Sequence, residues 1–478
     1  MKWVVSSDEE KKALSESKYS EENLIRGYVS ALLDSYSFNK KTAIVCGNGE
    51  TGLIGKELSL QILDSTLFVT NTKETKYKEK PIYVIDNNTS FSDYDVIVDA
   101  LIDTDFTGLI DDYNNMIINK INNSHKKVIS IDLNSGLDST SGLGNCIVKS
   151  DLTVSLNNFK YGHFLNMAKD YINDKINYSF GIKIDTKCSL LELPDFKDIL
   201  LERKNYSNKY DYGVSCILGG SNNFSGSIKL ANMASAAMRS GVGLSRLAVP
   251  ANMAQSVLPH VIESTVCTIE SKFGQMVFNK KDIDDALKDT NCLVIGMGWG
   301  KSREYSKILN YILNNYDKPI IIDADGINTL KDMDLSILKS YKNKIIITPH
   351  INEFSRITKK DVNKILLNPV KNVEEFANKW GIVVVLKGPT TIISDGEKTY
   401  LVNRGCSGMA TAGSGDVLSG ILGGLLAWSE YDLLVVGAGV FINGLAGEEA
   451  ENEVGAISML ATDTIKHIPT AIKKMKSI

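Results

Sequence analysis

A run of small residues and glycines leads directly into an aspartate at positions 410–416, where the chain reads Ala-Thr-Ala-Gly-Ser-Gly-Asp. An apolar helical stripe follows from Val417, which predicts a helix whose first turn is almost free of side chains. The backbone N–H groups of Gly413, Ser414 and Gly415 would converge on one anion, with Asp416 beside it. An anion hole next to a carboxylate suits phosphoryl transfer, because the carboxylate can take a proton from the attacking hydroxyl. A glycine turn capped by Asp416 before a buried helix explains the same residues equally well.

The composition describes an ordinary soluble protein. At 478 residues the chain is too long for one core, so two or three domains are expected. A hydrophobic fraction of 43% and a charged fraction of 23% are typical of globular proteins, and a net charge of −4 gives no indication of nucleic-acid binding. The seven cysteines are scattered without a C-x-x-C pair, which argues against zinc and favours a reducing cytoplasm.

The whole chain alternates short β-branched runs, glycine turns and helical stretches, a pattern typical of α/β architecture with mostly parallel sheets. A polar, charged stretch at 191–209 separates two halves with different motifs, so we expect domains at 1–205 and 206–478. The most apolar region, 417–446, is interrupted by Glu430 and Asp432 and predicts two buried helices instead of a membrane span.

Further candidate residues of the second half fall where predicted strands end. Ligands bind at such edges in open α/β sheets. A lysine followed by glycine suits a nucleotide phosphate, and a glutamate at a helix start could hold magnesium through water. Each feature also has a plainer explanation: a tight turn, a capping acid, a proline-started helix or a solvated lysine. The segments are Leu218–Ser227, Ile295–Gly300, Asp323–Asn328, Thr348–Glu353 and Lys387–Thr391.

Taken in order, Gly-Gly-Ser, Asp-Ala-Asp, Thr-Pro-His-x-x-Glu, Leu-Lys-Gly and Ala-Thr-Ala-Gly-Ser-Gly-Asp resemble the ADP/ATP-dependent NAD(P)H-hydrate dehydratases of the ribokinase-like superfamily. The resemblance covers about residues 206–475. Related kinases that phosphorylate vitamin precursors usually carry Asn where His350 stands, so the Thr-Pro-His form favours the dehydratase.

The resemblance implies a reaction in which ADP or ATP phosphorylates the C6 hydroxyl of NADH hydrate or NADPH hydrate, after which phosphate leaves. Asp416 is then expected to be the base, and Gly413, Ser414 and Gly415 to stabilise the transferring group. Magnesium is expected at Glu353 through water. The nucleotide would lie on Lys387, Gly388, Pro389, Thr390, Thr391 and Gly415, and the hydrate on Ser227, Gly298, Gly300, His350 and Asp416.

Residues 1–200 resemble the NAD(P)H-hydrate epimerase domain that accompanies this dehydratase in bifunctional bacterial proteins. The matching segments are Val45–Gly49, Val98–Leu101, Ile131–Asp138 and Phe159–His163. The resemblance implies that Asp132 acts at the substrate. It also implies a potassium site at Thr51, Asp99 and Ser135.

The first half departs from the epimerase pattern at its ligand loop. The family's Asn-Asn-Gly-Gly-Asp is replaced by Glu50-Thr-Gly-Leu-Ile54, and its Gly-Thr-Gly turn by Asp103-Thr-Asp105. These acids stand where a ligand carrying a diphosphate should approach, and unpaired like charges oppose binding. We therefore expect this half to keep its fold and to have lost or greatly weakened epimerase activity.

The expected architecture is two three-layer αβα domains, an N-terminal Rossmann-like one and a C-terminal ribokinase-like one. A hydroxymethylpyrimidine- or thiazole-type kinase is the alternative enzyme, and a nucleotide-binding sensor or scaffold is the non-enzymatic alternative. We expect a cytoplasmic homo-oligomer with small-molecule ligands and without nucleic-acid or membrane partners.

Overall fold

The computed structural model describes the chain except for residues 72–76, 78, 201, 237, 238 and 478. The described residues form two compact units. Residues 3–188 make up one of them, called the N-terminal unit. Residues 1–2 and 189–478 make up the other, called the C-terminal unit.

The N-terminal unit is built on a parallel sheet of seven strands in the order β4-β3-β2-β5-β6-β7-β9. Strands β2, β3 and β5 bury every side chain on both faces, as parallel strands covered by helices do, whereas β4 and β9 at the two edges are largely not buried. They are β2 (Thr42–Cys46), β3 (Ser65–Val69), β4 (Ile82–Val84), β5 (Val96–Ala100), β6 (Lys127–Ile131), β7 (Ser150–Leu156) and β9 (Ile172–Tyr178). Two short strands, β1 (Lys2–Val5) and β8 (Phe159–Lys160), pair in parallel outside that sheet.

Alternation along β2 decides which helices cover which face of this sheet. Ile44 and Cys46 pack in the same apolar cluster as α2 and α3, whereas Ala43 and Val45 pack in the cluster that contains α4. Three layers result, as expected from the sequence. The helices of this unit are α1 (Ser7–Ser15), α2 (Glu21–Ser35), α3 (Glu50–Gln61), α4 (Asp112–Asn122) and α5 (Ala168–Tyr171).

The C-terminal unit carries a second sheet, in which β13-β12-β11-β16-β17-β18-β19 are parallel and β20 and β21 are antiparallel additions at one side. β10 (Cys188–Leu190) lies next to β21. The other strands of the sheet are β11 (Val214–Leu218), β12 (Leu244–Pro250), β13 (Thr265–Ile269), β16 (Cys292–Ile295), β17 (Ile320–Ile322), β18 (Ile345–Ile347), β19 (Val383–Leu386), β20 (Thr391–Ser394) and β21 (Thr399–Val402). β14 (Ser271–Lys272) and β15 (Gln275–Met276) form a separate hairpin.

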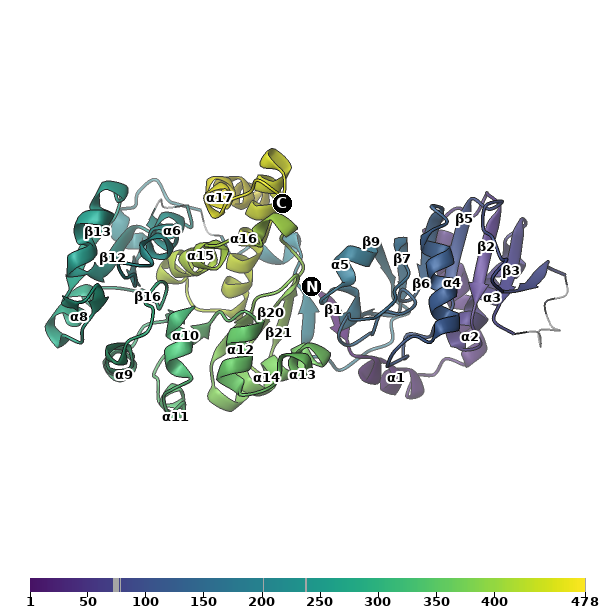
Figure 1. Ribbon diagram of the computed structural model, residues 1–478, viewed down its shortest axis with the longest axis horizontal. Helices are drawn as coiled ribbons and strands as arrows, with labels where there is room; N and C mark the ends of the chain where they lie inside the picture. Colours follow the sequence, from purple (N-terminus) through teal and green to yellow (C-terminus); the bar gives the residue numbers. More distant parts are fainter. Residues whose placement is uncertain (72–76, 78, 201, 237–238, 478) are drawn as a thin grey trace. The chain divides into compact units, whose positions relative to one another are not determined.

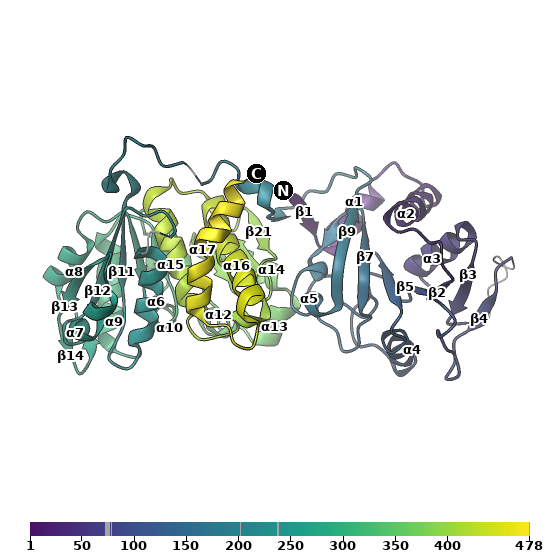
Figure 2. The same ribbon diagram turned by 90° about the horizontal axis from the view of Figure 1, so that it is seen from above.

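Helices cover both faces of this sheet (Figures 1 and 2). The face seen at the top of Figure 1 carries α6 (Ser225–Ala236), α15 (Ser414–Trp428), α16 (Leu433–Val454) and α17 (Ala461–Lys476). The opposite face carries α8 (Lys280–Leu287), α9 (Arg303–Asn315), α10 (Asp325–Leu330), α11 (Ser336–Lys339), α12 (Ile351–Thr358), α13 (Val362–Leu367) and α14 (Pro369–Trp380). α7 (Ala254–Val257) follows β12.

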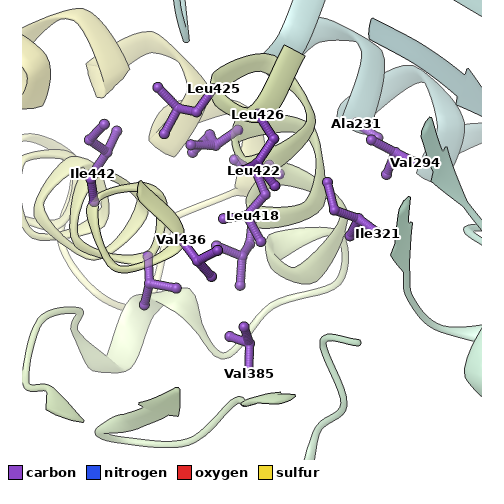
Figure 3. Packing of buried hydrophobic residues seen from close by; sticks show 14 of the residues in the cluster. Ala231, Val294, Ile321, Val385, Leu418, Leu422, Leu425, Leu426, Val436 and Ile442 are labelled. Carbon is purple, nitrogen blue, oxygen red and sulfur yellow. The ribbon is translucent and has the colours of Figure 1, made fainter. Parts of the chain in front are cut away.

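The apolar core lies between α15, α16 and the sheet (Figure 3). Leu422 and Leu425 of α15 pack against Gly439 of α16, whereas Val294 of β16 lies on another side of α15, next to Gly423. α16 is apolar and long enough to cross a membrane by composition, yet 83% of its most apolar window is buried inside this unit. Residues 417–446 thus form the two buried helices that the sequence predicts.

The α/β class and the parallel sheets are confirmed. The sequence predicts strands at 42–46, 82–86, 96–99, 128–132, 153–156, 214–218, 244–249, 292–295, 320–323, 344–348 and 383–387, and each of them coincides with an observed strand. It does not predict β3, β9, β13 or the β20–β21 hairpin. β9 carries only two isoleucines among polar residues, so it has no continuous apolar run. Residues 189–204, which we assigned to the first domain, pack with the C-terminal unit because Leu191, Phe196 and Leu200 are buried in its core.

Candidate active site

The first turn of α15 forms a backbone cradle at the carboxyl edge of the C-terminal sheet. Gly413 stands at the N-cap with φ of 93°, and a Cβ there would lie 2.3 Å from Leu230 Cδ1. The positive φ therefore favours glycine, and any larger residue would also have to displace the Leu230 side chain. Within the described part of the chain, the N–H groups of Gly413 and Gly415 have no acceptor, whereas the Ser414 N–H lies a long 3.5 Å from Thr411 O. Such free N–H groups at a helix N-terminus are available to an anion.

Beneath this turn lies a buried polar network of three side chains. Lys387 Nζ donates to Asp323 Oδ1 at 2.9 Å, and Ser419 Oγ donates to Asp323 Oδ2 at 2.7 Å. A Cβ added to Gly415 would lie 3.1 Å from Lys387 Nζ, so the ammonium group sits directly below the cradle. Burial opposes the charge of Lys387, but nearby Asp323 and Glu353 outweigh it and raise the lysine pKa. A positive charge is thus fixed where a phosphoryl group would approach.

Asp416 projects from the same turn and has the properties of a base. Burial first, and then the charge of Asp323, raise the pKa of Asp416 to about 7. A hydrogen bond from Ser227 and the charge of Lys387 act in the opposite direction. A carboxyl group with a pKa near neutrality is well matched to proton transfer at physiological pH.

The loops after β11 and β16 lie next to this carboxylate. Ser221 Oγ donates to Gly298 O at 2.8 Å, which ties the two loops together. Gly298 and Gly300 have φ values of 64° and 76°, so the turn depends on glycine at both positions. Gly300 N donates to Asp325 Oδ2 at 2.7 Å, which anchors the turn to α10. Ser227, Gly298 and Gly300 are thereby brought to one edge, as the sequence predicts.

His350 and Glu353 form a capping box at the start of α12. Glu353 Oε2 accepts from His350 N at 2.9 Å, and His350 Nδ1 accepts from Asn352 N at 3.1 Å. Burial lowers the pKa of His350, while the neighbouring charge of Glu353 acts in the opposite direction. His350 also pairs with Lys387 in a parallel bridge, so it borders the same site.

The described residues contain no group of three or more His, Cys, Asp or Glu side chains that could hold a metal ion. Glu353 is buried, its Oε2 accepts from His350 N, and its Oε1 lies 3.5 Å from His350 Nε2, outside the usual hydrogen-bond range. Magnesium commonly binds through one or two carboxylates, waters and substrate phosphates. Glu353 fits an ion that arrives with a nucleotide.

Residues 387–390 form the loop between β19 and β20, and Thr391 is the first residue of β20. Gly388 has only Thr390 O within 4 Å of an added Cβ, at 3.4 Å, so the backbone there is open to a ligand. Thr390 Oγ1 donates to Asn403 Oδ1 at 2.9 Å, which holds the loop against β21. Pro389 and Thr391 complete this segment at the predicted nucleotide site.

The corresponding pocket of the N-terminal unit has a volume of about 330 Å³ and contains Asp132. Asp132 Oδ1 accepts from Lys160 Nζ at 2.6 Å and from Leu156 N at 2.9 Å, while Oδ2 accepts from Thr104 Oγ1 at 2.6 Å. Burial alone would favour the neutral acid, but Lys160 outweighs it and lowers the pKa of Asp132. Lys160 Nζ also contacts Glu10 Oε2 at 2.8 Å. Asp132 is therefore held as a fixed anion.

The rim of this pocket is acidic. Asp103 Oδ1 accepts from Thr51 N at 2.9 Å, and Asp105 pairs with Lys11 at 2.6 Å. Burial raises the pKa of Glu50, and Asp132 and Asp103 raise it further. The rim thus presents negative charge to any ligand.

The three residues predicted for potassium are engaged within the protein. Asp99 Oδ2 accepts from Ser135 N and Ser130 Oγ at 2.9 and 2.8 Å, and Asp99 Oδ1 accepts from Ser135 Oγ at 2.6 Å. Thr51 instead contacts Asp103 through its backbone. The structure joins Asp99 to Ser135 directly. The potassium site at Thr51, Asp99 and Ser135 stays a prediction.

A family model described as NAD(P)H-hydrate dehydratase matches residues 215–470. The chain belongs to the NAD(P)H-hydrate dehydratase family. A model described as YjeF-related protein N-terminus matches residues 22–162, so both units have relatives.

Relatives of this family member cover most of its length. The bifunctional NAD(P)H-hydrate repair enzyme of Coxiella burnetii is 31% identical, over 78% of this chain and 75% of its own. The bifunctional NAD(P)H-hydrate repair enzyme of Dictyoglomus turgidum is 28% identical, over 91% of this chain and 90% of its own. A solved ADP/ATP-dependent NAD(P)H-hydrate dehydratase from Bacillus subtilis, co-crystallised with ATP and Mg²⁺, is 27% identical with a TM-score of 0.52, over 60% of this chain and 98% of its own.

Sequence reasoning missed several partners in this dehydratase-family chain. Ser419 follows Asp416 by three residues and thus shares its helix face, a signal that was available. Glu10 carries no such signal, because Glu9, Glu10 and Lys11 read as one solvated helix surface. Only the fold shows that Glu10 turns inward to Lys160.

Proposed function

We propose that the C-terminal unit dehydrates the S hydrate of NADH or NADPH at the expense of ADP or ATP. The proposal rests on the surroundings of Asp416. This carboxyl group has a pKa of about 7 and lies beside free N–H groups and the Lys387 ammonium. Family membership supports the same reaction. His350 at the edge of the site supports the dehydratase over a vitamin-precursor kinase, whose usual residue there is Asn.

The proposed chemistry follows from where each group lies. Asp416 takes the proton of the C6 hydroxyl while that oxygen attacks the terminal phosphorus of the nucleotide. Gly413, Gly415 and Lys387 stabilise the charge on the transferring group. The C6–O bond then breaks with help from the ring nitrogen lone pair, phosphate leaves, and loss of a C5 proton restores the dihydronicotinamide. Magnesium bound with the nucleotide near Glu353 would neutralise phosphate charge.

The test uses purified protein, the S hydrate of NADH, Mg²⁺ and either nucleotide. The proposal predicts recovery of absorbance at 340 nm with one inorganic phosphate released per NADH formed. Accumulation of a stable phosphorylated product without absorbance would instead support the kinase alternative. Running ADP and ATP separately identifies the donor, which the sequence leaves open.

We further propose that the N-terminal unit has lost or greatly weakened epimerase activity. Its Asp132 is bound to Lys160, Thr104 and Leu156, and its rim carries Glu50 and Asp103. Conversion of R to S hydrate by the full-length protein with the dehydratase base removed, at a rate above the spontaneous one, would refute this. Cytoplasmic location and homo-oligomerisation stay predictions.

A further inference from the structure

A second cavity of about 720 Å³ lies where α9 and α10 begin in the C-terminal unit. α10 packs against both α9 and α12, so all three helices border this region (Figure 1). Gly300 and Asp325 line the cavity and are joined by a hydrogen bond of 2.7 Å. Because Gly300 belongs to the proposed substrate turn, the cavity adjoins the candidate site at this residue, and it extends along α10 to Lys331 and Asp332.

The cavity has an excess of positive charge. Four cationic side chains and two carboxylates line it; they are Lys301, Arg303, Lys331 and Arg356 with Asp325 and Asp332. No salt bridge joins any of the four cations to a carboxylate in the described ranges of the chain. Elsewhere on α9, in contrast, Lys307 is paired with Glu304 at 2.6 Å. The positive groups of the cavity are therefore available to a ligand.

Hydrogen bonds hold one carboxylate of the cavity, Asp325, and one of its cations, Arg356, in place. Asp325 Oδ2 accepts from Gly300 N, and Asp325 Oδ1 accepts from Asn328 Nδ2 at 3.3 Å. Both carboxylate oxygens of Asp325 therefore have partners within the protein. Arg356 Nε donates to Asn328 Oδ1 at 3.1 Å and keeps its terminal nitrogens available. A guanidinium with free N–H groups is suited to two-point binding of phosphate oxygens.

We propose that this cavity binds a phosphate group of the dinucleotide substrate. The proposal rests on the proposed dehydratase function, because the hydrate is the phosphate-bearing ligand that must reach Asp416 from this edge. Two phosphate groups qualify: the diphosphate common to both hydrates, and the 2′-phosphate found only on NADPH hydrate. If the 2′-phosphate binds here, the protein prefers NADPH hydrate.

The experiment measures binding separately from turnover. Fluorescence titration with NADPH and with NADH gives the Kd of each for the full-length protein and for the double variant Lys301→Gln, Arg303→Gln. Lys307→Gln on α9 is the matched control, because Lys307 does not line the cavity. The KM for ADP or ATP is measured in parallel as a check on the nucleotide site.

We expect the double variant to raise the Kd by about tenfold or more, since charge-assisted hydrogen bonds to phosphate are lost. A rise for both ligands assigns the diphosphate, whereas a rise for NADPH alone assigns the 2′-phosphate. An unchanged Kd for both, or an equal effect of Lys307→Gln, overturns the proposal. A wild-type protein that binds NADPH tightly but never dehydrates the hydrate would refute the proposed function without refuting the cavity.

Discussion

Asp416 and Asp132 are aspartates at the carboxyl edges of two parallel sheets, yet their surroundings have opposite effects. Burial and the neighbouring carboxylate of Asp323 raise the pKa of Asp416 to about 7. Asp132 is bound by Lys160, Thr104 and Leu156, and its pKa is lowered. A general base must bind the proton that it takes, and a raised pKa makes this more favourable for Asp416. Asp132 is stabilised as an anion and is a poor base.

Removal of the Asp416 carboxylate is the largest expected perturbation. Asp416→Asn should lower kcat for S hydrate by about 10³-fold, within the usual contribution of a general base. Binding of ADP should persist, because Lys387 and the backbone cradle remain. The measurement is the initial rate at 340 nm, with calorimetry of ADP binding as the control. Full turnover by this variant would remove Asp416 from the mechanism.

The matching change in the N-terminal unit should affect stability and leave catalysis alone. Lys160→Met leaves Asp132 and Glu10 buried without their cation, so the free energy of unfolding should fall by about 3–5 kcal/mol. The loss should be smaller at pH 6 than at pH 8, because burial raises the pKa of Glu10 to about 7 and protonation removes its charge.

Lys11→Met is the control for that change. Lys11 lines the same pocket but is exposed and paired with exposed Asp105, so its loss should cost no more than about 1 kcal/mol. Urea denaturation of both variants gives the comparison. Equal destabilisation by the two would show that Lys160 is not the ion that holds the pocket together.

The pH dependence of activity tests why Asp416 differs from Asp132. Since the base must be ionised, kcat/KM should rise about tenfold per pH unit below a midpoint near 7 and level off above it. Asp323→Asn removes a neighbouring negative charge, so the pKa of Asp416 should fall and the midpoint should move to lower pH by about one unit. A midpoint that stays in place would mean that burial alone sets it. Ser419→Ala, which leaves the Asp323 charge in place, should shift the midpoint less.

Fold and site were predictable from sequence to different extents. Glycine turns and β-branched runs located most parallel strands, and the run ending at Asp416 located α15, because these patterns are local. The Asp323–Lys387–Ser419 network joins residues separated by up to 96 positions, and Glu10 reaches Lys160 across 150. Neither pairing leaves a local signal, so the difference in pKa between Asp416 and Asp132 emerges only from the folded chain.

The most direct test of this comparison supplies an equal mixture of R and S NADH hydrate with Mg²⁺ and ADP or ATP to the full-length protein. The account predicts prompt recovery of absorbance at 340 nm to about half of the total, followed only by the slow phase of spontaneous epimerisation. Added active epimerase should then complete the reaction. Prompt recovery of the full absorbance by this protein alone would show that Asp132 still works and would contradict the account.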